Sequence, residues 1–176
     1  MSKTNWQIDP AHSEVTFRVR HLMVSTVSGK FGSFSATAST TENDFSTADV
    51  EFTVDTASIN TGVDYRDTHL QSDDFFNSEK FPQMRFVSTS ITPAGENEFD
   101  LHGNLTIRDI TKPVALKVEF GGIAKDPYGN TKAGFEVSGK INRKEFGLQW
   151  DALTEAGGAV VGDEVKFQAN VQFAKA

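Results

Sequence analysis

The chain has 176 residues, contains no cysteine and carries a net charge of −7. This length suits a single domain over residues 1–176, and the lack of cysteine excludes disulfides and thiolate metal sites. The negative charge argues against nucleic-acid binding and, less strongly, against docking on anionic lipid surfaces.

The aromatic composition is uneven, with 15 Phe against 2 Tyr. Phenylalanine has no polar group to satisfy, so this composition favours a dry interior. Residues 1–5 are not followed by an apolar run, which predicts no secretory signal and no membrane span. We therefore expect a cytoplasmic protein, or an exported one if the chain is a trimmed form.

Apolar and polar residues alternate along most of the chain, which predicts roughly eight strands with one wet face each. A glycine, Gly32, interrupts the second strand and predicts a bulge or sharp bend there. The expected strands lie near residues 15–20, 30–40, 50–55, 86–91, 99–107, 114–120, 135–141 and 165–173.

Two helical inserts are expected, near residues 62–72 and near 144–155. In the first, Asp64 can cap a short helix, and Asp67 can reach back in the manner of a capping box. Phe75 and Phe76 follow this helix and predict an apolar plug behind it.

Short connections with turn residues, such as 95–97 and 126–130, predict sequential antiparallel hairpins. Continuous apolar runs typical of parallel strands are absent from the sequence. Eight such strands can close into an up-and-down barrel, which removes exposed edges. A two-sheet sandwich is the alternative that the pattern leaves open.

Four groups of residues, in order along the chain, resemble the YceI-like family. They are WQIDPAHS at 6–13; RDTHL at 66–70 with DFF at 74–76 and KFP at 80–82; LTIR at 105–108 with TKPV at 111–114; and FGL at 146–148 with VGDEV at 161–165. The resemblance implies an extended, lipocalin-like barrel that binds a polyisoprenoid or other lipid. It also implies a homodimer.

The resemblance further implies an apolar tunnel inside the barrel, which the inward-facing residues permit. Small inward residues such as Gly103 and Gly139 are expected to leave room opposite the rings. The expected tunnel residues are Phe17, Val19, Phe34, Phe52, Val54, Phe86, Leu101, Leu105, Leu116, Val118, Phe120, Phe135, Val137, Phe167 and Val171.

Charged groups that could meet a polar headgroup are Arg66, His69 and His21. Arginine suits a phosphate because its planar fork offers several donors. Arg66, Asp67 and His69 could equally form a hydrogen-bonded network that fixes the helix to the barrel.

The four histidines lack the spacing of a helical metal site, so we predict no metal and no cofactor other than a bound isoprenoid or lipid. Nucleophile elbows, phosphate loops and dinucleotide fingerprints are absent from the sequence. We therefore predict a non-catalytic carrier with no nucleic-acid partner. Two alternatives stay open: a small-molecule enzyme using Arg66, Asp67 and His69, and a packed-core interaction protein without a lipid ligand.

Overall fold

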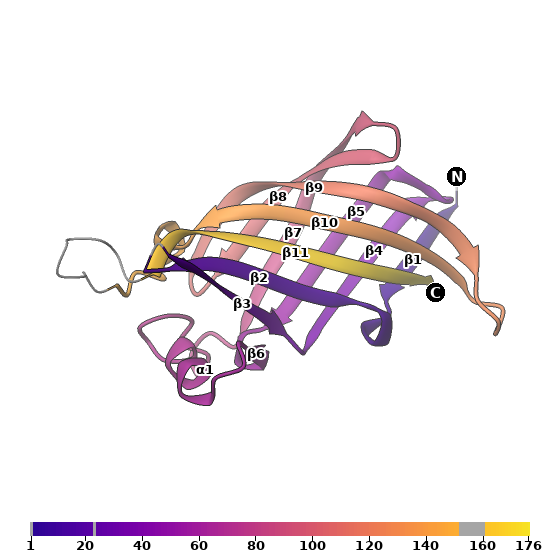
Figure 1. Cartoon of the computed structure of the whole chain (residues 1–176). Coiled ribbons are helices and arrows are strands. Elements are labelled where there is room, and N and C mark those ends of the chain that lie inside the picture. The colour runs from indigo at the N-terminus through magenta and orange to yellow at the C-terminus, as the bar shows by residue number, and fades with distance from the viewer. Residues whose placement is uncertain (1, 23, 152–160) are drawn as a thin grey trace.

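The computed structural model describes residues 2–22, 24–151 and 161–176. Eight antiparallel strands pair in the order β1-β4-β5-β7-β8-β9-β10-β11, and pairing between β1 and β11 closes the ring (Figure 1). These strands are β1 (Lys3–Ile8), β4 (Phe34–Thr41), β5 (Asp44–Asp55), β7 (Gln83–Gly95), β8 (Glu98–Ile107), β9 (Ile110–Lys125), β10 (Thr131–Asn142) and β11 (Val161–Lys175). The predicted all-β barrel is confirmed, and the sandwich alternative is wrong.

Three further strands extend the sheet from β11, namely β2 (Glu14–His21), β3 (Ser25–Phe31) and β6 (Ile59–Asn60). The long strand β11 pairs with β1 near its C-terminal end, where Phe173 lies opposite Ile8. Its N-terminal part pairs with β2, where Phe167 lies opposite Phe17. The expected strand 15–20 therefore exists but lies outside the ring, which β1 closes instead.

The bend expected at Gly32 is present and divides the predicted strand 30–40 into β3 and β4. The Gly32 amide donates to the Ser58 carbonyl at 3.1 Å, and the Asp55 amide donates to the Ser33 carbonyl at 3.0 Å. These bonds satisfy the backbone at the bend. Because the chain bends between Phe31 and Phe34, the alternation of apolar and polar residues restarts at Phe34 and Phe31 falls out of step with it.

The only α-helix in the described part of the chain is α1 (Asp64–Leu70), which lies at one end of the barrel (Figure 1). Its capping differs from the expectation, because Val63 is the N-cap and provides no side-chain bond. Asp67 instead reaches back to Thr61, accepting from its amide at 2.9 Å and its hydroxyl at 2.6 Å. No helix among the described residues is long and apolar enough to cross a membrane.

The other helical segments among the described residues are short 3-10 turns, η1 (Pro10–His12), η2 (Thr56–Ser58) and η3 (Arg143–Phe146). Of the expected second insert, 144–155, residues 144–146 lie in η3, which ends at Phe146 before Gly147 (φ 81°), and residues 147–151 are not helical. Residues 152–160 lie outside the described part of the chain.

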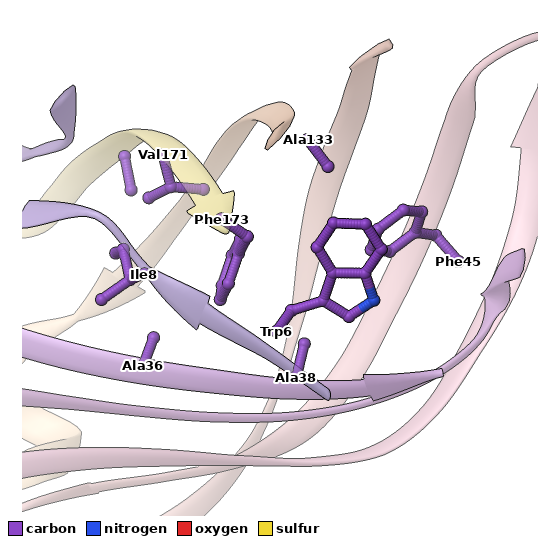
Figure 2. Close-up of a cluster of buried hydrophobic side chains, with 9 residues drawn as sticks. Trp6, Ile8, Ala36, Ala38, Phe45, Ala133, Val171 and Phe173 are labelled. Carbon is purple, nitrogen blue, oxygen red and sulfur yellow. The ribbon is translucent and has the colours of Figure 1, made fainter. Parts of the chain in front are cut away.

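Both chain termini lie at the same end of the barrel (Figure 1), and a buried cluster that includes Trp6, Phe45 and Phe173 packs inside that end. Trp6 is 1 % exposed, and its indole N–H donates to the Thr40 hydroxyl at 3.0 Å. The ring of Phe45 lies 5.0 Å from that of Trp6 (Figure 2) and also lies 4.8 Å from that of Phe135. Packed side chains therefore close this end of the barrel.

Candidate functional site

A cavity of about 240 Å³ lies inside the barrel, between its middle and the α1 end. Its wall is almost entirely apolar; among its few polar lining residues are Thr16, Arg85 and Arg143. Ten of the expected tunnel residues contribute to the wall: Phe17, Val19, Phe52, Val54, Phe86, Leu101, Leu105, Leu116, Val137 and Phe167.

The other five expected tunnel residues do not line this cavity. Phe120 and Phe135 belong to the closed end, with ring centroids 5.2 Å apart, and Val171 belongs to the same buried cluster. Phe34 stacks on Phe52 at 6.0 Å, and Val118 packs in the core around Phe86. Alternation predicts the face on which a side chain lies, but it does not predict the depth along the barrel axis.

Glycines on the inner face do not leave the open room that the sequence suggested. A Cβ atom built on Gly103 would lie 2.5 Å from Cζ of Phe86, and one on Gly139 would lie 2.7 Å from Cζ of Phe167. Gly29 is covered in the same way by Phe17. The phenylalanine rings thus already occupy the space above the glycines.

The cavity volume limits what can bind without movement. An engineered apolar cavity of about 150 Å³ holds benzene, whereas pockets for drug-sized ligands measure roughly 300–1,000 Å³. At about 240 Å³, the interior holds a short apolar group as it stands. A long chain requires ring rotation or displacement at the α1 end.

The α1 end of the cavity is covered by residues 70–76, which we call the plug segment. Leu70, Phe75 and Phe76 line the cavity, and both phenylalanines are buried. Arg108 holds the segment by donating to the Asp73 carbonyl at 2.7 Å and the Phe75 carbonyl at 2.8 Å. It also pairs with the Asp73 carboxylate at 2.8 Å. The plug that the sequence predicted is confirmed.

Arg66 and Asp67 form a hydrogen-bonded network with Thr61. The Arg66 guanidinium donates to the Thr61 hydroxyl and carbonyl, both at 2.8 Å, while Asp67 accepts from the amide and hydroxyl of the same residue. This arrangement matches the alternative in which these residues fix the helix. It ties the start of α1 to the residue that follows β6.

His69 lies beside the plug segment instead of in the Arg66 network. Its Nε2 is 2.8 Å from a carboxylate oxygen of Asp74, and its ring meets those of Phe75 and Trp150 edge-on at 5.2 Å and 4.9 Å. His21 ends β2, opposite Ser25 and Val161. Neither histidine lines the cavity and nor does Arg66, so a headgroup role for these three residues stays a prediction.

Sequence reasoning missed Arg143, a cation that is 2 % exposed and lines the apolar cavity. Its guanidinium donates to four backbone carbonyls, those of Leu148 (2.6 Å), Trp150 (2.8 Å), Gly162 (2.8 Å) and Val161 (3.2 Å). Burial lowers the pKa of Arg143, which nearby Asp151 and Asp163 oppose. An arginine nevertheless stays charged in proteins.

The hydrogen bonds of Arg143 indicate a structural role for this side chain. Four of its five N–H donors are occupied by carbonyls, so the side chain joins the segment after η3 to the start of β11. No sequence signal could have found it, because Arg143 follows the last alternating residue in a short polar run. Within the described ranges, no group of three or more His, Asp or Glu residues is placed to hold a metal ion.

The amino-acid sequence matches a known domain family and is similar to several bacterial proteins. A model of the YceI-like domain matches residues 6–173. A UPF0312 protein of Staphylococcus aureus (strain bovine RF122 / ET3-1) is 41% identical over 171 residues, which cover 97% of each chain. A UPF0312 protein of strain USA300 is 40% identical over the same share.

Solved structures share the fold. BcnA of Burkholderia cenocepacia gives a TM-score of 0.78 at 26% identity, covering 94% of this chain and 98% of BcnA. A YceI protein of Campylobacter jejuni gives 0.76 at 31% identity, covering 89% and 90%. A polyisoprenoid binding domain from Saccharophagus degradans gives 0.72 at 12% identity, covering 97% and 98%, which shows the fold alone. The match to the family model and the similarity to the Staphylococcus aureus proteins show that this chain belongs to the YceI-like family.

Proposed function

We propose that the protein carries a long apolar molecule, an isoprenoid or other lipid, inside the barrel and does not transform it. The observation that supports this proposal is the interior cavity, whose wall is apolar except at a few positions. Transfer of an alkyl chain from water into such a wall stabilises the complex by about 0.8 kcal/mol per CH₂ group. A polyprenyl phosphate or the tail of a quinone has the required chemistry.

Entry of the ligand would take place at the α1 end. The terminal end is closed by Trp6, Phe45 and Phe135, whereas Arg108 ties the plug segment at the other end to the barrel by two hydrogen bonds. Displacement of Phe75 and Phe76 would enlarge the cavity toward solvent. The headgroup would then remain at this end, near Arg66 and His69.

Two similarities support a lipid ligand. The family model covers nearly the whole chain, and a protein with the same fold is described as a polyisoprenoid binding domain. We also propose a homodimer in the cytoplasm, which sedimentation of the purified protein and fractionation of the host cells would test.

The first experiment is native mass spectrometry of the protein purified from its own host, followed by extraction and identification of any released molecule. A stoichiometric prenyl or acyl adduct supports carriage. If neither host-derived nor added quinones and polyprenyl phosphates give an adduct, the proposal is wrong.

A pair of variants locates the ligand. Leu105→Trp should fill the cavity and abolish the adduct, because Leu105 lines its wall. Val87→Trp is the matched control, since Val87 is an exposed residue of β7. Leu105→Arg should abolish binding as well, provided that circular dichroism shows it to be folded, because a buried unpaired charge also destabilises a protein. Parental affinity in folded Leu105 variants would place the ligand outside the barrel.

One observation favours a second candidate, a small-molecule enzyme. His69 and Asp74 form an imidazole–carboxylate pair beside Phe75, which lines the cavity. In that case His69→Ala would remove turnover of a cavity ligand while binding persisted. The carrier proposal requires that the bound molecule is recovered chemically unchanged from the parent protein and from the His69→Ala variant.

A further inference from the structure

The outer face of the sheet carries a hollow of about 910 Å³, which shares the lining residues Thr16, Phe17 and Phe167 with the interior cavity. It spans five neighbouring strands, β9, β10, β11, β2 and β3, and each strand contributes one cation to it. Among the residues that the structure describes, no Asp or Glu lines the hollow, although the chain has 24 acidic and 17 basic residues. The cations, in strand order, are Lys117, Lys140, Lys166, Arg18 and Lys30.

The strand register places three of these cations side by side. Lys140 is the cross-strand partner of Lys166, and Lys166 is the partner of Arg18. Neighbouring strands are about 4.8 Å apart, and like charges directly opposite one another destabilise a sheet. This arrangement costs stability, so a partner of opposite charge is the simplest physical reason to keep it.

The charge of the hollow is only partly cancelled within the molecule. Lys117 pairs with Asp100 at 3.5 Å, and Lys140 pairs with Glu164 at 3.6 Å. In the part of the chain that the structure describes, Arg18, Lys30 and Lys166 form no ion pair. The hollow therefore presents a positive potential to solvent in a protein whose net charge is negative.

Exposed apolar side chains lie at the edge of this cationic surface, toward the α1 end. Val24, at the tip between β2 and β3, is 80 % exposed, and Leu22 beside it is also exposed. Leu22 follows Arg18 by four residues, which corresponds to about 13 Å of extended chain at 3.3 Å per residue. Tyr65 on α1 is 82 % exposed and follows Gly62, which lines the hollow.

We propose that this face docks on an anionic lipid bilayer. Phosphate groups of the lipids would occupy the cationic hollow, while Val24, Leu22 and Tyr65 would enter the headgroup region. Basic residues attract anionic membranes, and apolar and tyrosine side chains favour the interface between water and hydrocarbon. The net charge of −7 argued against such docking, but local charge distribution decides where a protein binds.

A bilayer fits these observations better than other polyanions. Proteins that hold single-stranded nucleic acid stack its bases on aromatic side chains. The two phenylalanines of the hollow, Phe17 and Phe167, instead cover glycines and line the interior cavity, so they do not offer such a stacking surface. An acidic protein would explain the cations but not the neighbouring apolar tip. Docking also places the α1 end, where the ligand would enter, close to a lipid source.

This inference rests on the proposed carriage of a lipid for its biological sense, but its test does not require an interior ligand. Protein with an emptied or a filled barrel can be sedimented with vesicles, so the two proposals can fail separately. The probes are vesicles of an equimolar mixture of phosphatidylglycerol and phosphatidylcholine, and vesicles of phosphatidylcholine alone.

The protein should sediment with the anionic vesicles and remain in solution with the neutral ones. The double variant Arg18→Gln/Lys166→Gln should bind at least about tenfold more weakly, since each basic residue contributes on the order of 1 kcal/mol near an anionic surface. The matched control is Lys3→Gln/Lys125→Gln, which removes two exposed cations from the terminal end and should bind like the parent. Salt at about 0.5 M should abolish binding of the parent, because it screens exposed charges.

Several outcomes would overturn the proposal. These are absence of parental binding to anionic vesicles, equal weakening by both double variants, or conversion of a dimer to a monomer by Arg18→Gln/Lys166→Gln. The last result would mean that a second copy of the chain covers the hollow.

A third variant tests the apolar tip by itself. Val24→Ser should weaken vesicle binding while leaving its dependence on salt concentration unchanged. An unchanged affinity in a folded Val24→Ser protein would contradict insertion of the tip.

Discussion

The ring of Phe167 on β11 covers the backbone of Gly139, its direct cross-strand partner on β10. A Cβ atom on Gly139 would lie 2.7 Å from the ring and 2.8 Å from Cδ2 of Leu116. The absence of a side chain at this position therefore decides where a ring of the cavity wall can lie.

Gly139→Ala should destabilise the protein by about 1–3 kcal/mol, the usual cost of overpacking a core. Urea unfolding followed by circular dichroism measures the change. Gly134→Ala, in the same strand, is the control, because a Cβ there meets no atom within 4 Å. If both variants are equally stable, the ring has room that the observed packing does not show.

Arg143→Met should lower the free energy of unfolding by about 3 kcal/mol, because it leaves several buried carbonyls without their donor. Thermal unfolding monitored by calorimetry is the measurement. Arg85→Met is the comparison, since Arg85 makes an exposed ion pair with Glu51 and such pairs contribute about 0–1 kcal/mol. Equal effects of the two changes would contradict a special role for Arg143.

Arg108→Leu should loosen the plug segment, because Arg108 supplies two hydrogen bonds to its backbone. Hydrogen exchange of the amides of Phe75 and Phe76 should become faster, as expected for a segment with fewer tertiary bonds. Asp73→Asn removes only the ion pair and should have a smaller effect. Unchanged exchange in Arg108→Leu would show that apolar packing alone holds the plug.

The pKa of Asp9 is lowered from 3.8 to about 2, chiefly by the hydrogen bond from Lys132 and next by His12, while burial opposes both. Because the folded-state pKa lies below the unfolded one, the stabilisation is complete above about pH 4 and is lost as the pH falls toward 2. Since the pair is partly solvated, we expect about 1 kcal/mol.

Stability curves of the parent and of Asp9→Asn should therefore differ at neutral pH and converge as the pH falls below 4. Asp100→Asn is the control, because its partner Lys117 is largely exposed and their nitrogen–oxygen distance is 3.5 Å. A constant difference between parent and Asp9→Asn at every pH would contradict the assignment to the Asp9 carboxylate.

The sequence did not predict which strand closes the barrel. In β1 only Trp6 and Ile8 are buried apolar residues, too short a pattern to compete with the clear alternation of Val15, Phe17 and Val19. Yet β1 completes the ring, because β11 is long enough to pair with β1 at one end and β2 at the other. Such pairing joins residues more than a hundred positions apart, and no local pattern encodes it.

The sequence by itself determined the all-β class, the apolar face of the strands that it predicted, the bend at Gly32 and the plug formed by Phe75 and Phe76. These follow from local rules, since side chains in a strand alternate with a period of two and glycine permits close approach. Only the tertiary structure decided the depth of each phenylalanine along the axis, the burial of Arg143 and the row of cations across β10, β11 and β2. Those depend on strand register and ring closure, which are set by contacts between distant parts of the chain.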